Sequence, residues 1–486
     1  MVGESPLPIG RVLGINPAMK MKLSFHGASQ CVTGSCYLLE TKKLKMVIDC
    51  GMFQERQHED RNWDPFGFDP SDVDVVLLTH AHLDHCGLLP KLVKQGFSGR
   101  IHSTPASAQI AKIIMEDSAR IQMEDMKYKV KRLAKSGRTP KHGTTPIYDS
   151  KDAEAAAGLF SPIPAGQCID LGGGVTACWF EAGHILGACS IMVTVEEGSE
   201  RRQILFSGDI GRNNAPILED PTTFEEADYI LTESTYGNRN HEPVADIPTK
   251  FAEAINDAIK RGGNLVIPSF AVERTQDILY HLGNLQAEKR IPPVMTFVDS
   301  PMAVKVTEVF KENSQLWDAE TMRKVREGRR PFDFRGLVMS RSVAQSKAIN
   351  NIRGTAIIIA GSGMCTGGRV KHHLKNNIGR SEATILFVGY QAEGTLGRVI
   401  IEKAPEIRIF GEKYKVRAKI SKINGFSGHA DRDEMLAWIS CIKNTPKKVF
   451  VTHGDKTVAF EYAQYVESKT GFDTYVPKYQ ETVELD

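Results

Sequence analysis

The chain has 486 residues, of which 41% are hydrophobic and 25% are charged, a composition typical of soluble globular proteins with two or three domains. Its formal net charge of +2 excludes a protein that is basic throughout, so any contact with a nucleic acid has to come from local patches. The longest apolar runs, such as Ala383–Val388, are far shorter than the roughly 18 residues needed to cross a bilayer, which excludes a membrane partner.

The nine cysteines are scattered at irregular spacing and include no C-x-x-C pair. An odd, scattered set in a chain of this size is typical of reduced thiols in the cytoplasm. Cys86 follows His85 and Cys189 lies near His184, so both are candidate metal ligands. We favour the alternative that they are small packed residues, because cysteine is often simply buried.

The first 21 residues (1–21) contain prolines and glycines, show little periodicity and have no apolar segment typical of a secretory signal. We expect them to form a loose N-terminal extension. Compact structure is predicted to begin at Lys22, with strands over Lys22–His26, Ser35–Glu40 and Lys45–Ile48. The third strand ends at Asp49, which is either a turn residue or a group that orients a neighbouring loop. The first part of a first domain is predicted to cover residues 22–237.

The segment Val75–Gly87 contains the densest cluster of potential metal ligands in the chain. An apolar strand stops at Thr79, and His80, His82, Asp84 and His85 follow within six positions. A buried strand that opens into a tight loop can bring alternate residues to one point. Imidazole and carboxylate together favour zinc, with iron or manganese as rivals. The alternative, histidines that are neighbours by chance in a surface loop, explains this spacing less well.

A long amphipathic helix is predicted over Ala106–Lys135. Its C-terminal end is basic, and two more cations follow it (Lys127, Lys129, Lys131, Arg132, Lys135, Arg138, Lys141). Two interpretations stay open. The cations either form a solvated face that complements the negative end of the helix dipole, or they contact the backbone of a nucleic acid.

Several apolar strands end in a polar residue, as the strand before His80 does. Arg202–Phe206 leads to Asp209, Tyr229–Leu231 leads to Glu233, and Lys448–Val451 leads to His453. Sites in sheets built from strand and helix units gather at the carboxyl ends of strands, so these residues are expected to converge. His184 adds a histidine between two glycines, which let the backbone approach closely.

Four further strand–loop units predict a second, inserted α/β domain over residues 238–415, with a parallel sheet and helices on both faces. Its glycine-rich loops indicate contacts with phosphate groups, because helix N-termini present free N–H groups to anions. The alternative is that they are ordinary tight turns. The predicted phosphate-binding residues are Arg274, Ser362, Gly363, Arg369, Lys371, His372 and His373.

Residues 416–486 are expected to return to the first domain. Val416–Ile423 is predicted to be a strand, after which a sharp turn presents His429. Either Asp431 or Asp433 is expected to cap an amphipathic helix over Glu434–Ile442. By itself, His429 would more often be a structural residue than a functional one.

The motif H-A-H-L-D-H (residues 80–85), with His184, Asp209 and His453 downstream, resembles the metallo-β-lactamase superfamily. Glu233, His429 and His453 match the three additional motifs of its β-CASP branch, which includes ribonuclease J and the endonuclease that processes pre-mRNA 3′ ends. The resemblance extends from about Lys22 to Asp486. It implies an α/β fold, a metallo-β-lactamase αββα sandwich with an inserted parallel-sheet β-CASP domain, and a nuclease of single-stranded RNA.

The resemblance also implies a role for each residue of the site. One zinc ion is assigned to His80, His82 and His184, and a second to Asp84, His85 and His453, with Asp209 as the bridge. Mn²⁺ or iron are the alternative metals. A hydroxide held between the metals would attack the phosphorus. His429 would protonate the leaving 3′-oxygen, while Glu233 fixes its tautomer and raises its pKa. The catalytic residues are therefore Asp84, Asp209, Glu233 and His429, and the aspartate matching Asp49 orients the ligand loop.

The predicted function is hydrolysis of single-stranded RNA to 5′-phosphate and 3′-hydroxyl ends. A histidine at the third β-CASP motif, here His453, accompanies RNA rather than DNA enzymes. The chain ends soon after His453, without the long C-terminal domain of ribonuclease J, which favours endonuclease over 5′→3′ exonuclease action. Two alternatives are a small-molecule hydrolase of thioesters or lactams and a non-catalytic RNA-processing subunit. A homodimer would increase RNA binding, although no stretch identifies an interface.

Overall fold

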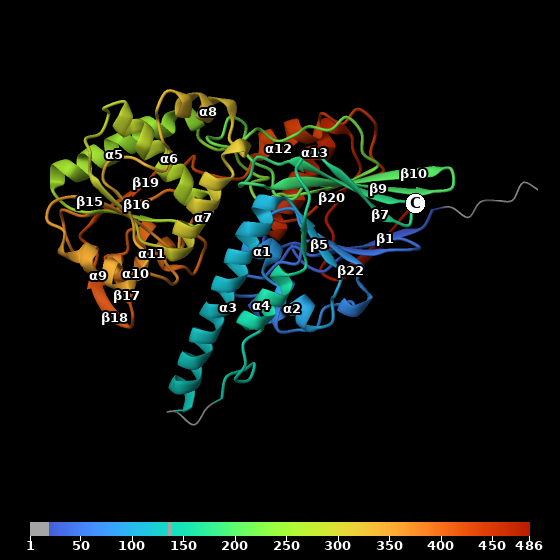
Figure 1. Ribbon diagram of the computed structural model, residues 1–486, viewed down its shortest axis with the longest axis horizontal. Coiled ribbons are helices and arrows are strands. Elements are labelled where there is room, and N and C mark those ends of the chain that lie inside the picture. The colour runs from blue at the N-terminus through green and yellow to red at the C-terminus, as the bar shows by residue number, and fades with distance from the viewer. Residues whose placement is uncertain (1–18, 135–138) are drawn as a thin grey trace, which may run out of the picture.

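The computed structural model describes residues 19–134 and 139–486. Figure 1 shows two units side by side, one built on two sheets and one built on a single sheet. The first sheet has seven strands in the order β22-β1-β2-β3-β4-β5-β6. These strands are β1 (Met21–Phe25), β2 (Tyr37–Glu40), β3 (Lys45–Ile48), β4 (Val75–Leu77), β5 (Arg100–Ser103), β6 (Phe160–Pro162) and β22 (Glu481–Leu485).

The second sheet also has seven strands, in the order β21-β20-β11-β10-β9-β8-β7. They are β7 (Cys168–Gly172), β8 (Val175–Glu181), β9 (Cys189–Glu197), β10 (Glu200–Phe206), β11 (Tyr229–Thr232), β20 (Lys448–Val451) and β21 (Thr474–Tyr475). A shared apolar core joins the two sheets, with Phe25 and Leu39 from the first and Trp179, Phe206 and Phe450 from the second. Burial of these large side chains stabilises the sandwich.

Helices cover the outer faces of both sheets, which confirms the predicted αββα sandwich. They are α1 (Leu83–Cys86), α2 (Leu89–Lys94), α3 (Pro105–Ala134), α4 (Ser150–Ala157), α12 (Arg432–Ile439) and α13 (Lys456–Thr470). The long helix α3 was predicted with nearly these bounds, and it also packs against α7 (Pro301–Glu312) of the other unit. Lys135 and Arg138, assigned to its basic end, lie outside the described residues.

The other unit is built on a six-stranded sheet in the order β14-β13-β15-β12-β16-β19, and every pairing in it is parallel. The strands are β12 (Leu265–Pro268), β13 (Met295–Val298), β14 (Leu337–Met339), β15 (Ala356–Ala360), β16 (Thr384–Phe387) and β19 (Lys419–Lys422), and a separate hairpin pairs β17 (Glu406–Ile409) with β18 (Glu412–Lys415). The central strands are apolar throughout because both of their faces are buried.

Helices lie on both faces of this sheet, as predicted, with α5 and α6 above it and α9, α10 and α11 below it in Figure 1. Their bounds are α5 (Ile247–Arg261), α6 (Arg274–Ala287), α8 (Ala319–Arg326), α9 (Val343–Ala348), α10 (Val370–Asn377) and α11 (Leu396–Ile401). Short 3₁₀ turns are η1 (Glu59–Asn62), η2 (Pro70–Asp72), η3 (Val244–Asp246), η4 (Ser314–Leu316) and η5 (Ile349–Asn351).

Three expectations about the fold are corrected. The strand expected over Val416–Ile423 as part of the first domain is β19, and it forms the edge of the inserted sheet by pairing with β16. Compact structure begins before Lys22, because Met19 and Met21 are each 1% exposed and β1 starts at Met21. The cysteines are not all free thiols, because Cys168 and Cys178 form a disulfide between paired positions of β7 and β8.

The helix expected after His429 is α12, and its N-terminus is capped by Asp431 rather than Asp433. Asp431 accepts from the backbone N–H groups of Asp433 and Glu434, while Glu434 accepts from the backbone N–H of Asp431. Across residues 19–134 and 139–486, none of the helices combines the length and apolar character that a bilayer crossing requires.

Candidate metal centre

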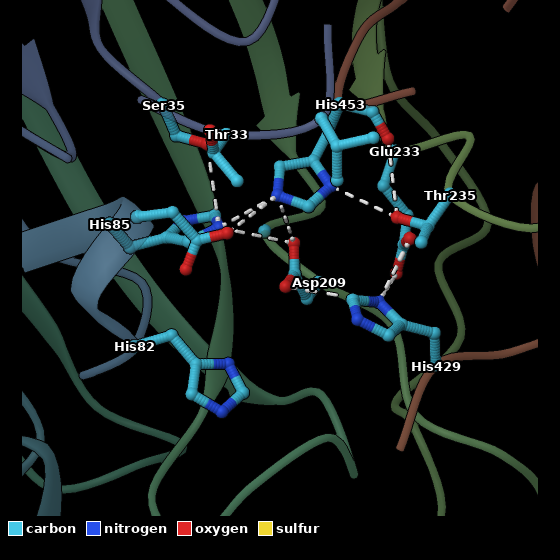
Figure 2. A network of polar contacts seen from close by, with 12 residues as sticks. Thr33, Ser35, His82, His85, Asp209, Glu233, Thr235, His429 and His453 are labelled. Atoms are coloured by element: carbon cyan, nitrogen blue, oxygen red, sulfur yellow. Dashed lines mark hydrogen bonds and ion pairs between the residues drawn. The ribbon is translucent and has the colours of Figure 1, made fainter. Parts of the chain in front are cut away.

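The loops that follow β4, β8, β10, β11 and β20 bring their polar side chains to one place. After β4, Thr79 ends the extended run and His82 stands immediately before α1, whose single turn presents Asp84 and His85. His184 follows β8, Asp209 follows β10, Glu233 follows β11 and His453 follows β20. Figure 2 shows the side chains of His85, Asp209, Glu233 and His453 pointing toward one another. The convergence of strand ends that the sequence predicted is therefore present.

His80, His82, His184 and Asp209 form the first ligand group. Their candidate ligand atoms all lie within 4.8 Å of one another. Oδ2 of Asp209 is 3.4 Å from Nε2 of His80 and 3.4 Å from Nε2 of His184. Nδ1 of His82 is 3.2 Å from Nε2 of His80 and 3.1 Å from Nε2 of His184. Burial lowers the pKa of all three imidazoles, which keeps them neutral, the form in which a histidine binds a metal.

Asp84, His85 and His453 form the second ligand group. Nε2 of His453 is 3.6 Å from Oδ2 of Asp84 and 3.2 Å from Nε2 of His85. Oδ1 of Asp209 is 3.3 Å from Nε2 of His85 and 3.6 Å from Nε2 of His453. Asp209 thus directs one oxygen to each group.

The ligand geometry fits divalent metal binding. Asp209 is 2% exposed, and its Oδ1 has no hydrogen-bond partner among the described residues. A buried carboxylate oxygen without a donor is costly, and a cation removes that cost. Ring nitrogens of different histidines face each other at 3.1 to 3.2 Å, as they do when they share a metal ion. Nitrogen and carboxylate ligands in this combination suit zinc and its neighbours in the first transition row.

The second ring nitrogen of four candidate ligand histidines has its own partner, which fixes the orientation of the ring. Nδ1 of His80 lies 3.1 Å from Oγ1 of Thr79. Nδ1 of His85 lies 2.8 Å from Oδ2 of Asp49. Nδ1 of His184 donates to the backbone carbonyl of Gly428 at 2.8 Å, and Nδ1 of His453 lies 3.0 Å from Oγ1 of Thr235.

Asp49 also holds the start of the ligand loop. Its carboxylate accepts from the backbone N–H and from the hydroxyl of Thr79, each at 2.8 Å. The residue is 1% exposed and has φ of 57°, a conformation that non-glycine residues adopt at a cost when the surroundings demand it. Asp49 is therefore more than a turn residue: it contacts both Thr79 and His85.

Glu233 and His429 lie next to Asp209, on the side away from His85 (Figure 2). Nδ1 of His429 is 3.1 Å from Oε2 of Glu233 and 3.8 Å from Oδ2 of Asp209. Burial by itself would lower the pKa of His429, but the negative charges of Glu233 and Asp209 together outweigh it and raise the pKa to about 9. Glu233 is held in turn, because its Oε1 accepts from the backbone N–H of Ile210 at 2.6 Å.

Cys86 and Cys189 are packed residues. Both are buried, neither belongs to a ligand group among the described residues, and Cys86 donates to the carbonyl of Ala81.

The predicted phosphate-binding residues have different surroundings from those expected. His373 is 1% exposed and its Nε2 lies 2.7 Å from Oδ2 of Asp299, so this nitrogen already has a partner inside the protein, and a contact of His373 with phosphate stays a prediction. Arg369 donates to the same carboxylate at 2.6 Å and to the backbone carbonyls of Ser340 and Arg341. Its charge is thus already neutralised within the protein, which removes the basis of the prediction.

Two other residues in that set also have partners inside the protein. Arg274 pairs with Asp277 at 3.4 Å and its side chain is 13% exposed. The ring of His372 packs on Phe410, in the hairpin of β17 and β18, at 4.7 Å between centroids. Ser362 and Gly363 lie in the loop after β15, at the edge of the sheet where a substrate contact was expected, and their contact with phosphate stays a prediction.

Sequence reasoning missed three groups that hold the site. They are Thr235, the carbonyl of Gly428, and Glu273, whose Oε2 accepts from the backbone N–H of Leu186 at 3.2 Å. Thr235 follows β11 and Glu273 follows β12, and a polar residue shortly after a strand end is the signal that could have identified them.

Three family profiles match the chain. The Metallo-beta-lactamase superfamily profile matches residues 30–292, the Beta-Casp domain profile matches residues 275–400, and the profile of the Zn-dependent metallo-hydrolase RNA specificity domain matches residues 413–477. The first covers more than half of the chain. A solved structure of a protein from Enterococcus faecalis V583 superposes with a TM-score of 0.56 at 12% identity, over 96% of this chain and 100% of the other, and shows the fold alone.

Two curated relatives match nearly the whole chain. Ribonuclease TTHA0252 of Thermus thermophilus is 37% identical over 436 residues, which cover 90% of this chain and 94% of that protein. Transcription termination factor FttA of Methanosarcina mazei is 28% identical over 480 residues, which cover 96% of this chain and 72% of that protein. The ligand geometry, the inserted parallel sheet and these matches agree, and the chain therefore belongs to the β-CASP branch of the metallo-β-lactamase superfamily and is a nuclease.

Proposed function

We propose that the protein is a zinc-dependent ribonuclease that cuts single-stranded RNA, chiefly as an endonuclease, and leaves 5′-phosphate and 3′-hydroxyl ends. The observation that carries the proposal is the placement of His429 and Glu233 beside a complete set of metal ligands that share Asp209. The relative from Thermus thermophilus is named a ribonuclease, and a profile for an RNA specificity domain matches residues 413–477. His453 at the third β-CASP motif also favours RNA over DNA.

Two zinc ions are proposed, with Mn²⁺ or iron as alternatives. His80, His82 and His184 would hold one and Asp84, His85 and His453 the other, with one oxygen of Asp209 for each. When bound, such ions lower the pKa of a water molecule between them and neutralise negative charge on the phosphate oxygens.

His429 is proposed as the general acid for the leaving 3′-oxygen. Glu233 accepts a hydrogen bond from Nδ1 of His429, so Nε2 is the nitrogen left to face the substrate and to donate its proton. Glu233 also favours the protonated ring, which is the form that an acid requires at neutral pH. Asp49, through His85 and Thr79, keeps the ligand loop in place.

The structure bears on two competing functions. A small substrate such as a thioester or lactam needs neither a second sheet unit beside the metals nor the pair of Glu233 and His429. A non-catalytic subunit would need some defect in the site, whereas the grouping of His80, His82, His184 and Asp209, and of Asp84, His85 and His453, supports metal binding. We also propose a cytoplasmic location and a homodimer, and sedimentation in solution tests the second.

Single-stranded RNA labelled at its 5′ end, incubated beside a matched DNA oligomer, tests the function. Zinc-loaded protein is expected to yield internal RNA fragments that end in a 3′-hydroxyl, with the DNA intact, and chelation should abolish them. The double variant His80→Ala plus His82→Ala, shown to be folded by circular dichroism, should not cleave. Failure of metal-loaded protein to cut any RNA would overturn the proposal. Successive release of mononucleotides from the 5′ end would instead show an exonuclease.

A further inference from the structure

Arg239 lies between two tyrosines that come from different units of the protein. Its guanidinium carbon is 4.8 Å from the ring centroid of Tyr236 and 5.4 Å from that of Tyr390. Tyr236 follows β11 in the sandwich, whereas Tyr390 lies in the loop after β16 of the inserted sheet. Arginine over an aromatic face is an attractive cation–π arrangement, so this stack holds two side chains and one charge at the junction of the two units.

The stack begins next to the proposed general acid. The ring of Tyr236 is 6.0 Å from the ring of His429, which in turn contacts Glu233. Successive contacts therefore lead from the metal centre to the loops at the carboxyl ends of the strands in the inserted sheet, through His429, Tyr236, Arg239 and Tyr390. Substrates of parallel sheets bind at that edge.

Arg239 and Tyr390 are accessible to a ligand. Tyr390 is 43% exposed, and Arg239 is exposed as well. Among the described residues no carboxylate lies within 4.0 Å of the Arg239 guanidinium, in contrast to Arg274 and Arg369, which are paired with aspartates. Arg239 is thus a cation near the metal centre whose charge is still available for a phosphate.

A second exposed aromatic side chain lies near Tyr390. Phe270, in the loop after β12, is 45% exposed, and its ring lies so close to Gly363 that a Cβ there would approach it to 2.8 Å. The side chain of Gln391 donates to the carbonyl of Gly363 at 3.0 Å, which ties the Tyr390 loop to the same point. Exposed rings with a nearby cation are the arrangement by which proteins bind single-stranded nucleic acids.

We propose that Tyr390 and Arg239 form a subsite for one nucleotide of single-stranded RNA, in which the base stacks on Tyr390 and the phosphate on its 5′ side pairs with Arg239. The inference rests on the proposed function. Since His429 protonates the leaving 3′-oxygen, the nucleotide that carries this oxygen lies on the His429 side of the scissile phosphate. Tyr236 and Arg239 lie on that side, which assigns the subsite to the nucleotide immediately 5′ of the cut.

The test combines two variants with two altered substrates, once the cleavage position has been mapped on a labelled RNA. Removal of the base immediately 5′ of the cut should lower kcat/KM of the unaltered protein roughly 5- to 100-fold, as expected for the loss of one stacked base. Tyr390→Leu should lower kcat/KM on the intact RNA by a similar factor and show little further loss on the abasic RNA. Removal of the base 3′ of the cut should affect both proteins equally. Tyr390→Phe should retain the activity.

Arg239→Ala should weaken binding of the intact RNA to the chelated, and therefore inactive, protein. RNA binding by this variant should also depend less on salt. The slope of log Kd against the logarithm of the salt concentration should fall by about one, as expected for the loss of one phosphate contact. Two matched controls leave the subsite untouched. Phe460→Leu removes a ring that, like that of Tyr390, is 43% exposed. Arg353→Ala removes an exposed arginine just before β15, at the amino ends of the strands in the inserted sheet.

The outcomes separate the two proposals. If the unaltered protein neither binds nor cleaves RNA, the proposed function is wrong. If it cleaves RNA while Tyr390→Leu and Arg239→Ala behave like their controls, the function stands and the subsite is overturned. Equal sensitivity of Tyr390→Leu and the unaltered protein to the 5′ abasic site would also overturn the assignment to that nucleotide. Thermal melting of each variant verifies that it is folded.

Discussion

Oε2 of Glu273 accepts a hydrogen bond from the backbone N–H of Leu186 at 3.2 Å. Glu273 belongs to the inserted unit, at the start of α6, whereas Leu186 lies two residues after the metal ligand His184. Glu273 is 5% exposed and has φ of 60° with ψ of −59°, a conformation that favours glycine. The inserted unit thus holds the His184 loop through a residue in a strained conformation.

Two variants separate the backbone strain at Glu273 from its hydrogen bond with Leu186. Glycine relieves the backbone but removes the acceptor for Leu186, whereas Glu273→Gln keeps an acceptor. We expect Glu273→Gly to weaken metal binding, because the His184 loop loses its support, and to leave a buried N–H group without a partner, at a cost of about 1–3 kcal/mol. Glu273→Gln should bind metal almost normally. Zinc competition with a chromophoric chelator measures the difference, and the exposed Glu226→Ala is the control. Normal zinc affinity in the glycine variant would contradict the positioning role.

Asp49→Ala should lower metal affinity by about 10- to 100-fold, the range found when a partner of a ligating histidine is removed. The variant loses the carboxylate that contacts His85 and Thr79, each at 2.8 Å. Asp49→Asn should lose less metal affinity, because the asparagine side chain retains one hydrogen-bond acceptor. Isothermal titration with zinc provides the values, and Asp125→Ala, an exposed change on α3, is the matched control. An affinity within twofold of the unaltered protein would exclude this role for Asp49.

Asp209→Asn should remove most of the stabilisation that zinc provides. A ligand at 100 times its Kd raises the free energy of unfolding by about 2.7 kcal/mol at each site. The amide replaces the only carboxylate in the described residues that directs an oxygen to each ligand group. Thermal melting with and without zinc tests this prediction. The unaltered protein should melt at a higher temperature with zinc, and an equal increase in the variant would show that Asp209 does not bridge.

Glu181 supplies a pH dependence of stability. Burial raises its pKa to about 7, although its carboxylate accepts from the backbone N–H of Gly183 at 2.9 Å. Because the folded-state pKa is above the unfolded value, the favourable contribution of the neutral acid is complete below about pH 4.5 and is lost as the pH rises through 7.

Glu181→Gln stays neutral, so it should match the unaltered protein near pH 5 and exceed its free energy of unfolding by about 2 kcal/mol at pH 8.5. Urea denaturation of chelated protein at both pH values measures the difference without a contribution from metal. A constant difference across the range would show that Glu181 does not titrate there.

The sequence predicted the candidate metal ligands because they are adjacent to strand ends, and strand ends are visible in an apolar pattern. His80, His184 and His453 are far apart in the chain, yet each follows a recognisable strand. The same reasoning did not reveal the pairing of Arg369 and His373 with Asp299, since this common partner reaches them only through the folding of the inserted sheet. A pattern reveals which face a residue occupies, but it does not reveal which carboxylate has already neutralised a cation.

The edge strand β19 illustrates a second limit. None of its four residues is fully buried: the middle two are partly buried and the outer two are exposed, as suits a strand at the edge of a sheet. The pattern predicted a strand correctly but did not reveal which of two sheets it would join. That choice is made by pairing with β16, a non-local contact.

The pairing of β11 with β20 spans the whole inserted unit, and β22 pairs with β1 across almost the entire chain. During synthesis, His80, His82 and Asp84 emerge from the ribosome long before His453 and the strand that positions it. Contacts so distant in sequence form late in folding. A nascent chain therefore lacks a complete set of candidate metal ligands until the segment with His453 has been released.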